Sequence, residues 1–127
     1  MTLRTQVVNL REIESGTAVG YAATYRASQP TRIATLAIGY ADGVPVSTSG
    51  RGCVLIRGRR HPIAGRVSMD FIGVVVDETV ALGDEAILFG TGQGTQLPVE
   101  EAAASAETHA YELLIRVGSR VPREYSD

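Results

Sequence analysis

The chain has 127 residues, with 12 basic against 14 acidic side chains and a formal net charge of −2. This near-neutral balance gives no strong field for nucleic acid or for an anionic membrane, and neither is expected as a partner. No apolar stretch reaches the roughly 18 residues of a membrane span, and no basic leader precedes an apolar segment, so a cytoplasmic location is expected. The length suits a single domain over residues 1–127.

Period-two alternation of apolar residues predicts a series of short strands. In chain order they cover residues 3–8, 31–40, 54–56, 62–67, 72–76 and 85–89. Residues typical of turns separate them, at 14–16, 47–50, 57–58, 82–84 and 90–94. Strands this short and this regularly interrupted predict a mostly β fold, a small antiparallel, Greek-key-like barrel.

Near the C-terminus the pattern predicts one or two short helices. Residues 98–107 begin with Pro98, which suits a first helical turn, and continue with acidic residues and then alanine. A second short helix is predicted to follow Thr108 as its N-cap and to run to Arg116. Gly118 prevents its continuation.

The cysteine and the histidines indicate structural roles. Cys53 is the only cysteine, which excludes an intramolecular disulfide, and its apolar surroundings predict a buried side chain. His61 and His109 are the only histidines, and no cysteine or acidic cluster accompanies either. We therefore expect no metal site.

The only basic cluster consists of Arg51, Arg57, Arg59 and Arg60. The aromatic residues of a single-strand nucleic-acid surface are missing around it, so a solvated hairpin tip is the favoured interpretation. A non-catalytic barrel that binds an oligonucleotide or a protein through these side chains stays open as an alternative function.

Five short blocks carry most of the chemical information. They are VGYAAT at 19–24, IGYADG at 38–43, GRVSMD at 65–70, AYELL at 110–114 and RVPREY at 120–125. Tyr21 has small neighbours that would let a ligand approach its hydroxyl, although a half-buried strand tyrosine shows the same pattern. Asp42 and Gly43 are typical of a turn. Arg120 and Arg123 could anchor the C-terminal tail by pairing with acidic residues.

In this order the five blocks resemble the C-terminal β domain of alanine racemase, a pyridoxal-phosphate enzyme that interconverts L- and D-alanine. The resemblance runs from Leu3 to Tyr125. It implies an isomerase that supplies D-alanine for cell-wall precursors and acts as a homodimer, with the cofactor on a lysine of an N-terminal barrel domain. All 12 basic residues here are Arg. This chain therefore cannot hold the cofactor as a Schiff base, and alone it is expected to be inactive.

The resemblance also implies roles for individual residues. Tyr21 matches the tyrosine that acts on a partner subunit's cofactor as one of two catalytic acid–bases, because racemisation needs a proton-transferring group on each face of the substrate. Met69 matches the residue whose backbone N–H holds the substrate carboxylate, and Tyr40 matches a residue of the narrow entrance to the site. Arg66 and Asp70 match the entrance and its supporting hydrogen bonds.

Tyr111 matches the residue that donates its hydroxyl to the cofactor phosphate.

Two positions depart from the family pattern: Val46 stands where an arginine is common, and Gly50 where an asparagine is common. An entrance without that arginine would be less polar and less restrictive, which leaves alanine and other small amino acids as candidate substrates. A related β domain occurs in decarboxylases of basic amino acids, but the cysteine-centred block of those enzymes is absent from this sequence.

Overall fold

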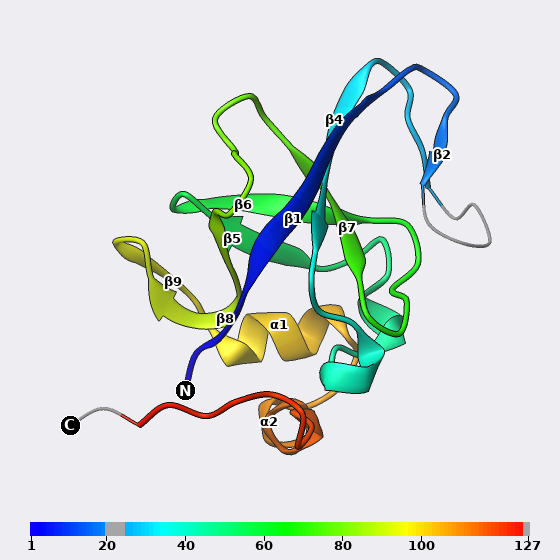
Figure 1. Cartoon of the computed structure of the whole chain (residues 1–127). Coiled ribbons are helices and arrows are strands. Elements are labelled where there is room, and N and C mark those ends of the chain that lie inside the picture. The colour runs from blue at the N-terminus through cyan, green and yellow to red at the C-terminus, as the bar shows by residue number, and fades with distance from the viewer. Residues whose placement is uncertain (20–24, 126–127) are drawn as a thin grey trace.

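The computed structural model describes residues 1–19 and 25–125 (Figure 1). Its strands are β1 (Leu3–Ile13), β2 (Ala18–Val19), β3 (Tyr25–Arg26), β4 (Thr31–Leu36), β5 (Cys53–Ile56), β6 (Arg59–Ala64), β7 (Ile72–Val76), β8 (Glu85–Gly92) and β9 (Thr95–Leu97). The 3-10 turns η2 (Tyr40–Asp42) and η3 (Val46–Thr48) follow β4, and the helices α1 (Val99–Ser105) and α2 (Ala110–Arg116) follow β9. The predicted mostly β fold with short C-terminal helices is confirmed.

Antiparallel pairing closes the strands into a barrel. Hydrogen-bonded neighbours follow the order β1-β4-β7-β6-β5-β8, and β8 pairs back with β1 in a register that places Leu3 opposite Phe89. Strand β9 extends the ladder of β8, while β2 and β3 pair antiparallel in a separate two-stranded sheet. Closure satisfies the backbone groups that an open sheet would leave unpaired at its edges. Figure 1 shows α1 across one end of the barrel and α2 beyond α1.

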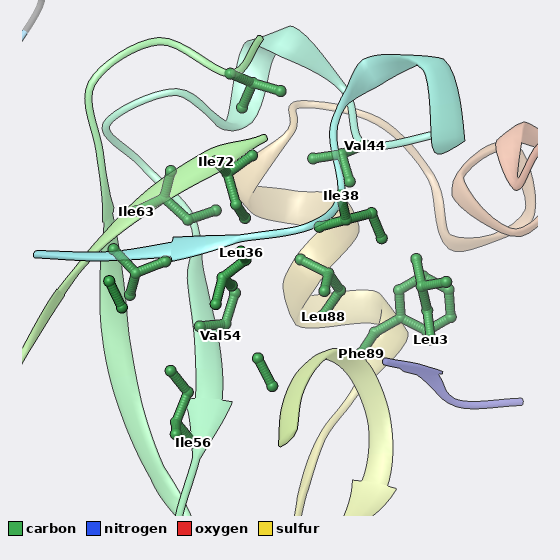
Figure 2. Packing of buried hydrophobic residues seen from close by; sticks show 14 of the residues in the cluster. Leu3, Leu36, Ile38, Val44, Val54, Ile56, Ile63, Ile72, Leu88 and Phe89 are labelled. Carbon is green, nitrogen blue, oxygen red and sulfur yellow. The ribbon is translucent and has the colours of Figure 1, made fainter. Parts of the chain in front are cut away.

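The hydrophobic core fills the barrel and continues to the end that the helices cover. Every second residue of β7 is buried, as its period-two sequence predicts. Figure 2 shows Leu36 and Val54, from β4 and β5, pointing into one interior. Ala103 of α1 and Leu113 of α2 belong to the same cluster. The two helices are therefore fixed to the barrel by apolar packing.

The strand predicted over residues 31–40 is too long. β4 ends at Leu36, and Tyr40 lies in η2. Gly39 N–H donates to Asp42 Oδ2 over 3.0 Å, and Asp42 N–H donates to the Gly39 carbonyl over 3.0 Å. These local hydrogen bonds close a turn, which an alternation of apolar residues does not encode.

Strands β1 and β6 also depart from their predicted ranges. β1 continues to Ile13, which pairs with Thr31 of β4, so a long-range partner extends the strand beyond its apolar alternation. β6 spans Arg59–Ala64 rather than 62–67, because it pairs with β5 from the hairpin turn onward. It ends where Gly65 takes a left-handed φ of +76°.

Two turn predictions are corrected as well. Residues 90–92 belong to β8, and the turn consists of Gln93 and Gly94, whose φ angles are +59° and +78°. Consecutive left-handed residues are typical of a tight hairpin. The N-cap of α2 is His109 rather than Thr108, whose hydroxyl instead donates over 2.7 Å to a glutamate carboxylate in the helix.

Candidate functional site

The loop between β6 and β7 lies against η2 and brings the two predicted substrate-binding residues, Tyr40 and Met69, together. Tyr40 N–H donates to the Ser68 carbonyl over 3.0 Å, and Ala41 N–H donates to the Met69 carbonyl over 3.1 Å. These bonds place the backbone of Tyr40 beside that of Met69. A Cβ on Gly39 would overlap the Ser68 carbonyl oxygen, so only glycine permits this approach.

Three large side chains on this pair of segments face outward. Tyr40 is 45% exposed, Met69 53% and Phe71 49%. Within the described residues no acceptor binds the N–H of Met69. A backbone donor without a partner, beside exposed apolar side chains, suits an anionic group such as a carboxylate delivered from outside the chain.

One guanidinium joins η2 to the β6–β7 loop. Arg120 donates through Nε to Asp42 Oδ1 over 2.5 Å, and through Nη2 to Asp42 Oδ2 over 3.2 Å and to Asp70 Oδ1 over 2.5 Å. Asp42 is only 9% exposed. The hydrogen bonds from Arg120 lower the pKa of Asp42 and outweigh the opposing effect of burial. In return, the hydrogen bonds to the two carboxylates raise the pKa of Arg120.

The segment after α2 is tied to η2 by backbone contacts as well. Gly118 N–H donates to the Asp42 carbonyl over 3.1 Å. A Cβ on Gly43 would lie 2.5 Å from a carbonyl oxygen at the end of α2. Arg123 donates to backbone carbonyls of residues 117, 118 and 121 over 2.7–2.9 Å. Both arginines of the tail thus anchor it, but Arg120 does so on acidic side chains and Arg123 on the backbone.

Of the remaining predicted site residues, Arg66 and Asp70 lie in the β6–β7 loop itself, Tyr111 lies in α2, and Tyr21 lies outside the described residues. Tyr111 lies in the first turn of α2 and is 76% exposed. Arg66 is exposed in the β6–β7 loop, and the ionic partner of Asp70 is Arg120. Tyr21 falls within residues 20–24, which are not among the described residues.

The sequence alone did not connect Asp42 with Arg120. The two residues are 78 positions apart, and no short-range pattern links them. Asp42 was predicted as a turn residue and Arg120 as an anchor, and each prediction is correct in isolation. The available signal was that both residues lie inside the five blocks.

Each arginine of the basic cluster has an acidic partner. The ion pairs are Arg51–Glu107, Arg57–Asp84, Arg59–Asp77 and Arg60–Glu101. Exposed pairs of this kind add little stability, but they neutralise the cluster locally. A phosphate backbone would have to compete with these carboxylates, so the pairing favours a solvated hairpin over an oligonucleotide surface.

Cysteine and histidine take no part in the site. Cys53 is partly rather than fully buried, and burial raises the pKa of its thiol, which makes it a weak nucleophile. His61 is 5% exposed, with Nε2 3.2 Å from the Ile56 carbonyl oxygen. In the described part of the chain no group of three or more His, Cys, Asp or Glu could hold a metal ion. Among the described residues, no helix has the length and hydropathy of a membrane-spanning segment.

The lowered pKa of Asp42 predicts how stability depends on acid. The ion pair stabilises the fold fully above the unfolded pKa, about 3.9, and this stabilisation disappears as the pH falls through the lower folded pKa. The free energy of unfolding should fall less steeply below about pH 4 in Asp42→Asn than in the wild type. Urea unfolding in steps from about pH 6 to pH 2 measures this difference.

The exposed Glu78, which lies on the turn after β7, supplies the control. Glu78→Gln removes one exposed carboxylate and leaves the contact between Asp42 and Arg120 in place, so its acid slope is the reference against which the slope of Asp42→Asn is judged. An identical slope in the wild type and in Asp42→Asn would show that Asp42 is not linked to folding through its charge.

Comparison with known proteins identifies the family. The sequence model described as "Alanine racemase, C-terminal domain" matches residues 1–125. The alanine racemase of Halothermothrix orenii is 45% identical over 130 aligned residues, which cover 100% of this chain and 34% of that protein. The crystal structure of the biosynthetic alanine racemase from Pseudomonas aeruginosa has a TM-score of 0.93 and 43% identity, over 99% of this chain and 35% of that one.

A third relative carries a cofactor. The alanine racemase from Bartonella henselae, solved with covalently bound pyridoxal phosphate, has a TM-score of 0.89 and 34% identity over 98% of this chain and 34% of that one. The chain thus spans about a third of the length of these relatives. Because the family model matches nearly the whole length of the chain, this chain belongs to the alanine racemase C-terminal domain family.

Proposed function

We propose that residues 1–127 are the C-terminal β domain of a cytoplasmic, pyridoxal-phosphate-dependent racemase that interconverts L- and D-alanine or the enantiomers of another small amino acid. The observation that carries this proposal is 45% identity to an alanine racemase across the entire chain. D-Alanine formed in this way would serve cell-wall precursors. The cofactor-bearing domain and a second subunit would complete the active site.

Tyr21 is the proposed catalytic residue of this chain. Racemisation removes the α-proton from one face of the substrate and returns a proton to the other, which calls for one acid–base on each face. A phenol has a pKa of about 10, so Tyr21 needs a nearby cation or hydrogen-bond donor to act near neutral pH. We assign that environment to the assembled site, where this chain meets its partner subunit.

Met69 and Tyr40 are the proposed substrate-binding residues. The Met69 N–H has no acceptor in the described part of the chain, and its peptide is held in place by the hydrogen bonds to η2. A fixed backbone N–H is a suitable donor to a substrate carboxylate. Tyr40 lies beside it with its side chain 45% exposed, where it would narrow the path to the site. Arg66 and Asp70 would support this entrance.

The residues of this chain fit a supporting role toward pyridoxal phosphate. The exposed phenol of Tyr111 can donate to a phosphate oxygen, which is a charge-assisted hydrogen bond. The chain has no lysine, so the covalent attachment must come from another domain. When bound, the cofactor withdraws electrons from the α-carbon and makes the α-proton removable.

A fusion protein tests the proposal. The fusion enzyme joins the N-terminal part of the Pseudomonas aeruginosa alanine racemase to this chain, which replaces the 35% of that protein it matches. We expect the fusion enzyme to retain pyridoxal phosphate and to racemise alanine. The 127-residue chain alone should do neither. Circular dichroism of D- and L-alanine solutions measures the rate of racemisation. The same measurement with serine tests whether a less polar entrance admits another small amino acid.

The isolated chain provides the complementary measurement. Mixed with pyridoxal phosphate and desalted, it should keep no stoichiometric adduct that borohydride can trap, because it offers no lysine side chain. Weak reaction at the terminal amine is the only adduct expected. A trapped adduct on an internal residue, or a folded fusion enzyme that holds the cofactor without racemase activity, would contradict the proposal.

A further inference from the structure

Three segments that are remote in sequence meet at one side chain. Arg120, after α2, donates to Asp42 of η2 and to Asp70 of the β6–β7 loop. Asp70 directly follows Met69, and Asp42 lies two residues after Tyr40. The guanidinium therefore binds close sequence neighbours of both proposed substrate-binding residues without itself being one of them.

The geometry of one peptide group links this ion pair to the substrate. The Ser68 carbonyl and the Met69 N–H belong to the same peptide, and in a planar trans peptide these two groups point in opposite directions. Because Tyr40 N–H holds the Ser68 carbonyl toward η2 over 3.0 Å, the Met69 N–H points away from η2. Any movement of η2 against the loop would turn this donor.

We propose that Arg120 is a positioning residue: by holding Asp42 and Asp70 on one guanidinium, it locks η2 against the β6–β7 loop and so aims the Met69 N–H at the substrate carboxylate. The inference rests on the proposed function. It assigns the C-terminal segment after α2 a part in substrate binding rather than only in anchoring the chain end.

The side-chain chemistry explains why an arginine is required. The backbone bonds between the two segments are the 3.0 and 3.1 Å contacts of Tyr40 and Ala41, and Arg120 adds side-chain contacts that join the same two segments. The planar guanidinium reaches two carboxylates at once with its donors in a fixed fork. A lysine carries a single point charge on a flexible stem and cannot hold the two carboxylates in one geometry.

The first test measures the lock in the 127-residue chain itself. Arg120→Gln should speed amide hydrogen exchange at Tyr40 and Ala41 by about tenfold or more, while the barrel strands keep their protection. Arg57→Gln is the matched control, since Arg57 also forms a bidentate ion pair, with Asp84, over distances of 2.7 and 3.1 Å. Its exchange at Tyr40 and Ala41 should equal that of the wild type.

The second test uses the fusion enzyme. Arg120→Gln should raise KM for alanine about tenfold and change kcat by less than about threefold, because substrate positioning is weakened and the proton-transferring groups are intact. Arg120→Lys should not restore KM. Asp70→Asn removes the ion pair between Arg120 and Asp70 and keeps the one between Arg120 and Asp42. It should also raise KM for alanine. Arg57→Gln should match the wild-type enzyme in both constants.

The outcomes separate this inference from the proposed function. An inactive, cofactor-loaded wild-type fusion enzyme refutes the proposed function, and the exchange experiment still decides whether Arg120 locks the loop. An active fusion enzyme in which Arg120→Gln leaves KM and exchange unchanged overturns the inference alone. Faster exchange throughout the barrel would make Arg120 a general structural residue and overturn it too. If Arg120→Gln does not fold, Asp70→Asn decides by the same two readouts.

Discussion

Racemisation by the fusion enzyme is expected to fall by about 10²- to 10⁴-fold in both directions on Tyr21→Phe, the range associated with loss of one general acid–base. The change keeps the aromatic ring and removes only the hydroxyl that exchanges a proton on one face of the substrate. If a lysine serves the other face, exchange of the α-proton with solvent should survive for one enantiomer. Deuterium incorporation into D- and L-alanine, measured separately by mass spectrometry, reports each face.

Other tyrosines of the chain serve as controls for this result. Tyr125→Phe should behave as the wild type, since its ring is 93% exposed near the chain end. Tyr40→Phe should alter KM and access more than the exchange rates, and Tyr111→Phe should mainly weaken retention of the cofactor. Equal loss of exchange for both enantiomers in Tyr21→Phe would mean that the tyrosine only positions the cofactor, and the two-base assignment would be wrong.

Gly39→Ala is expected to have the largest effect on stability. The new Cβ would overlap carbonyl atoms of Ser68 and Met69, and these are backbone atoms that cannot move aside as a flexible side chain would. Separating η2 from the loop would break their two backbone hydrogen bonds and disturb the Asp42 ion pair. We expect a loss of more than about 3 kcal/mol, which is a large part of the stability of an ordinary domain.

Gly50→Ala is the matched glycine variant. Gly50 has φ +70°, and no atom lies within 4 Å of the position that an added methyl group would take, so alanine there would meet backbone strain but no clash. The expected loss is about 1 kcal/mol. Urea midpoints of both variants, with the wild type, measure the contrast. A midpoint for Gly39→Ala equal to that of Gly50→Ala would show that the close approach of η2 and the loop is not needed for folding.

Local patterns were sufficient for the parts of the fold that depend on neighbours in sequence. The alternation in β7 predicted its bounds, and the alanine-rich stretch after Pro98 predicted α1. β7 buries one face against the core, so its apolar period is visible in the sequence, whereas α1 was predicted from Pro98, the acidic first turn and the alanines that follow. By contrast, β1 runs on to Ile13 through pairing with a distant strand, and no local period marks such an extension.

The candidate site followed the same division. The five blocks led to Tyr40 and Met69. In the structure the two residues lie side by side, because Tyr40 N–H donates to the Ser68 carbonyl and Ala41 N–H donates to the Met69 carbonyl. The strand expected through Tyr40 was wrong, because the Asp42 side chain closes a turn there. The contact of Asp42 with Arg120 depends on the complete path of the chain, so separate segments of sequence could not reveal it.

The pairing of Leu3 with Phe89 constrains the order in which the barrel forms. β1 is synthesised well before β8, and until β8 is available one edge of β1 stays open. Bringing β1 and β8 together reduces the conformational entropy of the chain between them before their hydrogen bonds form. Contacts between residues so far apart in sequence therefore slow folding. A nascent chain of this domain therefore carries one unpaired edge of β1 until β8 has been synthesised, and an unpaired edge is open to pairing with a strand of another molecule.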